Sequence, residues 1–213
     1  MPIRMYTDTP PSSPPPTSSH PSENQSHQPT NPPSYSTQSL HTNFIPRPDH
    51  LSQQILWIGC SDSDCTETTT LNFLPEEMLE HRNLGNMIIP GDLSSEISIR
   101  HAVCELRVKH IVVCGHYGCG IVRASSREGL PGLWSSKLDS LHAKHRHHID
   151  LLPVQQRDDV FVELNILDQL RSLRGMAEVE EATRRGELSL HGMVYDPLSG
   201  RAVALSEGCS EDV

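Results

Sequence analysis

The sequence predicts an α/β fold in which helices flank a largely parallel central sheet. After residue 50, short apolar runs alternate with segments whose apolar residues recur every three to four positions. Two of these runs end in glycine and are followed by polar turns that carry cysteine or histidine. Because the carboxyl ends of parallel strands meet at one edge of a sheet, we expect these turns to form the functional site.

The expected strands are short and rich in β-branched residues, as buried strands usually are. They are QQILWIG at 53–59, MIIP at 87–90, HIVVCG at 110–115, LSLHGMVY at 188–195 and RAVAL at 201–205. The last two are separated by the turn sequence DPLSG, which predicts that they pair as an antiparallel hairpin.

Three segments have helical periodicity. The first covers 94–109, and either Ser94 or Ser95 is a suitable N-cap. The second begins at Asp158 or Asp159, and the third covers 176–185. The apolar side chains that form one face of the second helix are Val160, Leu164, Leu167, Leu170 and Leu173. Between 128 and 156 the pattern is weak and predicts no defined element.

The composition divides the chain. Residues 1–50 hold 12 of the 17 prolines and only scattered apolar side chains, whereas all 13 glycines follow residue 58. A segment with so little apolar surface cannot offset its ordering entropy, so we expect 1–50 to be a disordered Pro/Ser/Thr-rich tail. Residues 51–206 are long enough for one domain, and 207–213 form a polar C-terminal tail.

Charge and hydropathy limit the partners. The net charge is −10 and no basic stripe is present, which argues against nucleic acid. No apolar run approaches the ~20 residues of a membrane span, so we expect no membrane association. The N-terminus lacks the apolar core of a secretory signal, and the six cysteines then indicate thiols or metal ligands. We expect a cytoplasmic protein, with a mitochondrial one as the alternative.

Cysteine and histidine follow two of the predicted strands. Cys60 comes directly after the first strand, and His116-x-x-Cys119 follows the third. Thiolates and imidazole favour zinc, and three protein ligands leave the fourth position open, as in catalytic zinc sites. The alternative is that these cysteines are small buried side chains without a ligand role.

Several local sequences resemble the β-class carbonic anhydrase family. The two signatures are GCSDS at 59–63 and CGHYGCG at 114–120. Further segments follow in the order of the family: ETT at 67–69, HRNLGN at 81–86, VKHIVV at 108–113, VELN at 162–165 and HGMVYD at 191–196. The resemblance extends from about residue 55 to about residue 205.

The resemblance implies a mainly parallel, twisted central sheet flanked by helices, assembled as a homodimer or a multiple of dimers. It implies one Zn²⁺ per chain on Cys60, His116 and Cys119, with Asp62 accepting a hydrogen bond from the zinc-bound water. The implied reaction is reversible hydration of CO2 to bicarbonate and a proton by a zinc-bound hydroxide. A carbonyl sulfide hydrolase and a non-catalytic zinc protein are the alternatives on the same scaffold.

One position departs from the family pattern. The family has arginine two residues after the aspartate, where it holds the aspartate away from the metal, but here the residue is Asp64. Asp62 could then close the site as a fourth zinc ligand, or repulsion between the carboxylates could raise one pKa. Either would weaken CO2 hydration, and Asp64→Arg should restore it. Arg82 or Arg123 could instead replace the missing arginine.

Other histidines and cysteines have alternative interpretations. His142, His145, His147 and His148 form either a second metal site or a group of surface histidines. Cys65 is a loop thiol or a disulfide partner for Cys60. Cys104 and Cys114 are expected in the core, whereas Cys209 lies in the polar C-terminal tail.

Overall fold

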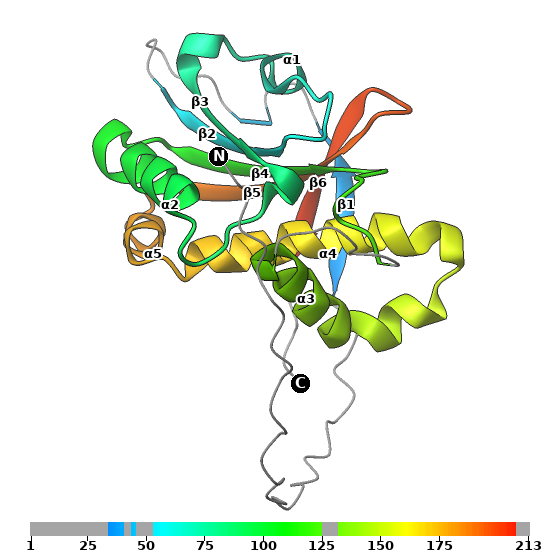
Figure 1. The fold of residues 1–213 in the computed structure, drawn as a ribbon. Coiled ribbons are helices and arrows are strands. Elements are labelled where there is room, and N and C mark those ends of the chain that lie inside the picture. The colour runs from blue at the N-terminus through cyan, green and yellow to red at the C-terminus, as the bar shows by residue number, and fades with distance from the viewer. Residues whose placement is uncertain (1–33, 41–43, 46–52, 125–131, 208–213) are drawn as a thin grey trace, which may run out of the picture. The chain divides into compact units, whose positions relative to one another are not determined.

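A computed structural model describes residues 34–40, 44–45, 53–124 and 132–207 (Figure 1). Its centre is a six-stranded sheet in the order β1-β6-β5-β4-β2-β3. The strands are β1 (Tyr35–Ser39), β2 (Ile55–Cys60), β3 (Met78–Asn83), β4 (His110–His116), β5 (Ser189–Asp196) and β6 (Arg201–Glu207). The four neighbouring strands β3, β2, β4 and β5 are parallel, whereas β6 pairs antiparallel with both β5 and β1. The predicted α/β class and the hairpin of β5 and β6 are therefore confirmed.

Helices cover the two faces of the sheet unequally. The helices are α1 (Glu67–Leu71), α2 (Leu93–Arg100), α3 (Gly132–Leu151), α4 (Val154–Arg174) and α5 (Ala177–Arg184). Figure 1 shows α1 on one side of the sheet and α3, α4 and α5 on the other. The larger apolar core lies on the α4 side, and a smaller core around Trp57 and Phe73 lies on the α1 side. None of the described helices has the length and hydropathy of a membrane span.

The strand predicted at 87–90 is wrong. The strand that pairs with β2 on this side is β3. It contains charged residues, as an edge strand can, so its sequence lacks the apolar pattern of a buried strand and did not predict it. Met87, Ile88 and Ile89 are buried without joining the sheet. The amide of Ile88 donates to Gln169 Oε1 on α4 at 2.8 Å, so helix packing accounts for these apolar residues.

Both predicted N-caps are also displaced. Helix α2 is capped by Asp92, whose carboxylate accepts from the Ser94 amide at 3.2 Å, and it continues as one wide turn over His101–Leu106. Helix α4 starts at Val154 after Pro153, and the Asp158 carboxylate inside it accepts from the Ala124 amide. The weak pattern at 128–156 contains the 20-residue helix α3, whose few apolar positions suffice to pack on α4.

Strand β1 lies inside the segment predicted to be a disordered tail, so that prediction is wrong for Tyr35–Ser39. It pairs along β6 from Tyr35 opposite Glu207 to Ser39 opposite Val203. Tyr35 donates from its hydroxyl to Glu163 Oε2 on α4 at 2.6 Å, which anchors the strand. Four of the five side chains are exposed, so composition alone could not reveal it. Residues 1–33, 46–52 and 208–213 lie outside the described part.

The hydrogen bond of Tyr35 yields a stability prediction. Tyr35→Phe should lower the free energy of unfolding by about 1–2 kcal/mol, because it removes a donor to a buried carboxylate. Chemical denaturation measures the change. Ser36→Ala on the exposed side of the same strand is the control and should have little effect. Equal stability of the two variants would show that β1 is not held through Tyr35.

Two neighbouring histidines lie on the α1 side of the sheet. His110 Nδ1 of β4 and His191 Nε2 of β5 are 3.1 Å apart, and the Phe44 ring contacts the His191 ring edge-on at a centroid distance of 5.4 Å. Burial, with a contribution from His110, lowers the pKa of His191 to about 4. The folded protein therefore holds this imidazole neutral at neutral pH.

This lowered pKa predicts sensitivity to acid. The unfolded chain takes up a proton near pH 6.5 but the folded chain only near 4, so the free energy of unfolding should fall as the pH falls through this window. We expect His191→Gln to remove about 1–3 kcal/mol of that pH dependence. Denaturation at pH 7 and pH 4.5 measures it, with His101→Gln at an exposed position as the control. An unchanged pH dependence in His191→Gln would contradict this assignment.

Candidate metal centre

The site lies at the carboxyl ends of two adjacent parallel strands. Cys60 is the last residue of β2 and His116 the last residue of β4. Their register, with Gly59 opposite Cys114, brings the two ends side by side. Gly115 lets α4 approach, since a Cβ there would lie 2.9 Å from Ile166 Cδ1. The turn after β4 then brings Cys119 back toward both residues.

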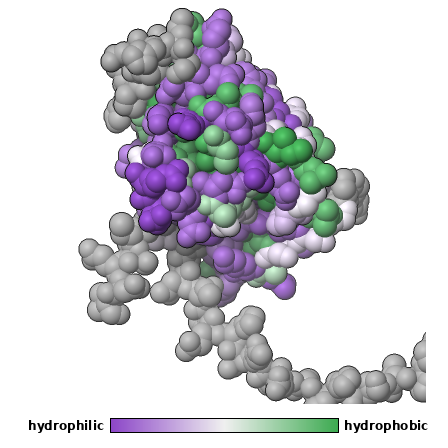
Figure 2. Space-filling view, turned by 90° about the vertical axis from the view of Figure 1, so that its left-hand side faces the viewer, coloured by the Kyte–Doolittle hydropathy of each residue, from purple (hydrophilic) through white to green (hydrophobic). Residues whose placement is uncertain are grey.

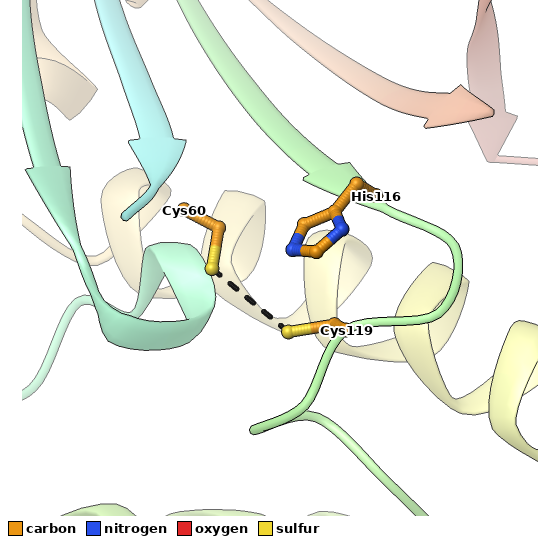
Figure 3. A group of neighbouring side chains, drawn as sticks. All are labelled: Cys60, His116 and Cys119. Atoms are coloured by element: carbon orange, nitrogen blue, oxygen red, sulfur yellow. Dashed lines mark hydrogen bonds between the residues drawn. The ribbon is translucent and has the colours of Figure 1, made fainter. Parts of the chain in front are cut away.

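Cys60, His116 and Cys119 converge on one point (Figure 3). One ligand atom from each lies within 4.8 Å of the others, and the two sulfur atoms are 3.9 Å apart. All three side chains are buried. The structure thus brings together the three residues that the sequence placed at two strand ends.

The imidazole of His116 is oriented for a ligand. Its Nδ1 lies 3.2 Å from the carbonyl oxygen of Tyr117, an arrangement that leaves Nε2 with a free lone pair. Nε2 is buried and has no hydrogen-bond partner among the described residues. A buried, unpartnered imidazole nitrogen is costly unless something coordinates it. Together with two sulfur atoms, it fits a soft divalent cation such as zinc.

Backbone amides surround the sulfur atoms. Cys60 Sγ accepts from the amides of Asp62 at 3.4 Å and Gly85 at 3.2 Å, and Cys119 Sγ accepts from Val122 at 3.5 Å. The hydrogen bond with Cys119, aided by His116 and by the amides of Asp62 and Gly85, lowers the pKa of Cys60 to about 4. The bond to ionised Cys60 raises the pKa of Cys119. A bound dication would favour the ionised form of both thiols.

Asp62 lies beside this group rather than in it. Its Oδ2 accepts from the Gly120 amide at 2.8 Å, next to Cys119. Within the described ranges, no carboxylate joins the three ligand atoms at that mutual distance. The side chain is exposed, and no arginine or lysine of the described part forms an ion pair with it. The carboxylate is therefore positioned by a backbone amide.

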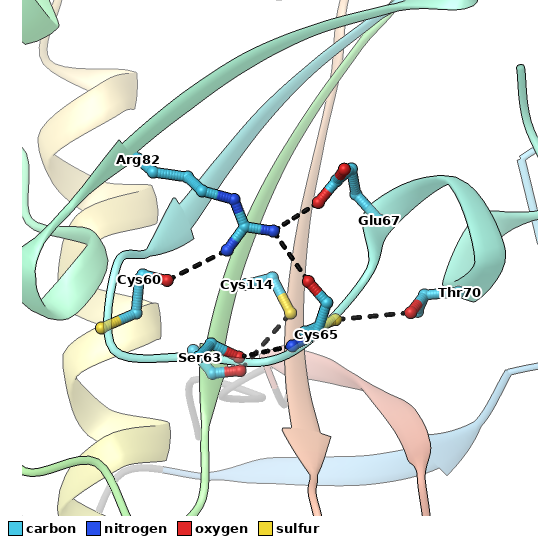
Figure 4. Close-up of polar contacts among 8 residues, drawn as sticks. Cys60, Ser63, Cys65, Glu67, Thr70, Arg82 and Cys114 are labelled. Carbon is cyan, nitrogen blue, oxygen red and sulfur yellow. Dashed lines mark hydrogen bonds and ion pairs between the residues drawn. The ribbon is translucent and has the colours of Figure 1, made fainter. Parts of the chain in front are cut away.

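Arg82 is fully engaged elsewhere. Its guanidinium donates to the carbonyl oxygens of Cys60 at 3.0 Å and Cys65 at 2.8 Å, and it pairs with the carboxylate of Glu67 (Figure 4). It thus fastens both ends of the loop that carries Asp62. It does not contact the Asp62 carboxylate, so it does not replace the missing arginine by direct pairing.

Asp64 faces a different part of the molecule. With Thr66, Tyr195 and Arg201 it lines a cavity of about 440 Å³. Burial, and next the charge of Asp64, raises the pKa of Tyr195. Asp64 is exposed, and no hydrogen bond from it to Asp62 is present in the described structure.

The other predicted thiols and histidines do not join this centre. Within the described residues Cys60, His116 and Cys119 form the one group that could hold a metal, so the alternative of a second metal site at residues 142–148 gains no support. Among the four histidines at 142–148, His145 is buried rather than on the surface. Cys65 is buried in the smaller core, away from Cys60 in the larger one, and Cys114 is buried as predicted. Cys104 is exposed, contrary to the prediction, and Cys209 lies outside the described residues.

Sequence reasoning missed the backbone donors and one side-chain network. The Gly85 and Gly120 amides leave no side-chain signature, although both glycines lie in motifs of the resemblance. Glu163 on α4 accepts from the hydroxyls of Tyr35 and Tyr117, both at 2.6 Å. Tyr117 directly follows His116, so this network helps to fix the turn that carries His116 and Cys119. Glu163 belongs to the VELN segment at 162–165, which is the sequence signal that could have indicated this network.

The fold and the site define an α/β protein with a buried Cys-His-Cys group, able to hold a metal ion, at the edge of its sheet. The carbonic anhydrase family model matches residues 55–202, and the chain belongs to the β-class carbonic anhydrases. A carbonic anhydrase of Emericella nidulans is 34% identical over 154 residues, covering 70% of this chain and 68% of the relative.

Solved structures show the same likeness. The β-carbonic anhydrase CafD of Aspergillus fumigatus is 41% identical, with a TM-score of 0.73 over 79% of this chain and 98% of that one. One of two tetrameric β-carbonic anhydrases from Sordaria macrospora is 33% identical, with a TM-score of 0.66 over 73% of this chain and 81% of that one. The predicted family and its α/β fold are thereby confirmed.

Proposed function

We propose that this chain is a zinc-dependent carbonic anhydrase that catalyses reversible hydration of CO2 to bicarbonate and a proton. The observation that carries the proposal is the buried convergence of Cys60, His116 and Cys119, with His116 Nε2 unpartnered, in a member of this family. Two thiolates and one imidazole would hold one Zn²⁺ per chain. Zinc in such a set supplies a Lewis acid that lowers the pKa of water toward ~7.

The role proposed for Asp62 follows from its hydrogen bond. Because the Gly120 amide occupies Oδ2, the other carboxylate oxygen is available to accept a hydrogen bond from the reacting water. Because an ionised carboxylate accepts hydrogen bonds and donates none, Asp62 would orient the O–H of the water toward itself. The amides on Cys60 and Cys119 reduce the charge that the thiolates carry toward the substrate.

The substrate assignment is tested by comparing two linear molecules. Initial rates with CO2 and with carbonyl sulfide are measured at equal concentration on protein whose zinc content is one per chain. The proposal expects CO2 turnover to exceed carbonyl sulfide turnover. Faster turnover of carbonyl sulfide would reassign the chain as a hydrolase, and no turnover of either would leave the non-catalytic alternative.

We further propose that the protein is a homo-oligomer built from dimers. The Sordaria macrospora relatives are tetrameric by name, and α2 exposes Leu93 and Ile97 to 67% and 65%. Figure 2 shows the face on which α2 and α5 lie, where apolar residues interrupt a mainly hydrophilic surface. Light scattering during size-exclusion chromatography tests this, and a monomeric mass at micromolar concentration would contradict it.

The cytoplasmic location stays a prediction, to be tested by cell fractionation.

A further inference from the structure

We propose that Arg123 is the positioning residue that holds Asp62 off the metal, in place of the arginine that the family carries at position 64. This inference rests on the proposed zinc site. It assigns to Arg123 an action through the backbone, whereas the family's arginine acts by direct pairing.

The Cys119–Gly120 peptide group links the two side chains. Its carbonyl oxygen accepts from Arg123 Nε at 3.3 Å, and its N–H donates to Asp62 Oδ2 at 2.8 Å. A charged donor on the carbonyl polarises the peptide and strengthens the hydrogen bond that its N–H makes. Arg123 therefore orients this peptide group and strengthens the hydrogen bond that its N–H donates to Asp62.

The guanidinium also lies close to the carboxylate. The position of a Cβ on Gly120 would be 3.0 Å from Asp62 Oδ2 and 4.0 Å from Arg123 Nη2. Since both distances start at one point, these two atoms are separated by no more than 7.0 Å. Arg123 Nη1 and Nη2 have no hydrogen-bond partner within the described ranges. The positive charge thus favours the carboxylate in its present place.

Arg82 and Arg201 do not act in this way. The guanidinium of Arg82 is engaged by two carbonyl oxygens and Glu67. Arg201 lines the cavity on which Asp64 lies and makes no hydrogen bond to the Asp62 loop within the described residues. Without Arg123, the Cys119–Gly120 peptide loses its polarising partner, and Asp62 is freer to rotate toward the cation.

Binding of a small anion distinguishes an open metal position from a closed one. Protein loaded with Co²⁺ is titrated with azide, and the visible absorption of the metal reports binding. We expect the wild-type protein to bind azide and Arg123→Gln to bind it at least about tenfold more weakly, because Asp62 then competes for the position. Adding Asp62→Ala to Arg123→Gln should restore binding.

Matched variants separate positioning from simple structural damage. Arg146→Gln on the exposed side of α3 is the control and should bind azide as the wild type does. If Arg123→Gln does not fold, Arg123→Lys takes its place and should show intermediate weakening.

Two results would overturn the proposal. Either Arg123→Gln binds azide as tightly as the wild type, or the Asp62→Ala addition fails to restore binding at equal cobalt content. The azide titration does not depend on CO2 turnover. An inactive zinc-loaded wild type that still shows this azide pattern would therefore refute the proposed function while supporting the role of Arg123.

Discussion

Replacing Cys119 with serine is expected to abolish zinc binding and to reduce CO2 hydration to the rate of the buffer. Cys119 Sγ is buried 3.9 Å from Cys60 Sγ, and a serine hydroxyl neither ionises at neutral pH nor suits zinc as a thiolate does. We expect zinc affinity to fall by more than the ~100-fold that loss of an outer-shell partner costs. Elemental analysis after dialysis measures the zinc retained per chain.

Cys104→Ser is the matched control for this substitution. Cys104 is exposed and lies on the turn after α2, apart from the metal centre. We expect that variant to retain full zinc content and wild-type CO2 hydration. If Cys119→Ser also retained its zinc, Cys60, His116 and Cys119 would not be the ligand set.

The second large effect is expected for Asp62→Asn. This substitution keeps the size of the side chain, but an amide can donate where the carboxylate only accepts, so the water would be misoriented. We expect CO2 hydration to fall ~100-fold with zinc content unchanged, a typical loss for a positioned acceptor. Stopped-flow rates normalised to zinc measure it.

Asp64→Asn provides the comparison on the same loop. It makes the same chemical change two residues away, where the side chain faces the Tyr195 cavity and not the metal centre. We expect its rate to stay within about twofold of the wild type, because no described contact joins Asp64 to the centre. A larger loss in Asp64→Asn than in Asp62→Asn would show that the roles of the two carboxylates are assigned wrongly.

The sequence allowed us to predict that Cys60, His116 and Cys119 lie together, because two of them follow buried strands directly. Cys60 and His116 end β2 and β4, whose apolar and β-branched residues make the strands visible in the pattern. Parallel pairing then requires the two strand ends to meet. The return of Cys119 to the same point needed only a short turn.

The sequence could not reveal elements whose stability comes from distant partners. Strand β1 is polar and exposed, and it is held by β6 and by the hydroxyl of Tyr35 on Glu163, 128 residues away. Strand β3 is a charged edge, and α3 buries few apolar residues for its length. The link from Arg123 to Asp62 passes through a peptide group, and no pattern of side chains predicts that contact.

The central claim is tested most directly by stopped-flow CO2 hydration on wild-type protein with one zinc per chain. The account predicts a rate well above that of buffer, proportional to zinc content and lost when a chelator removes the metal. A rate equal to that of buffer, with zinc fully bound, would contradict it and remove carbonic anhydrase activity from this chain.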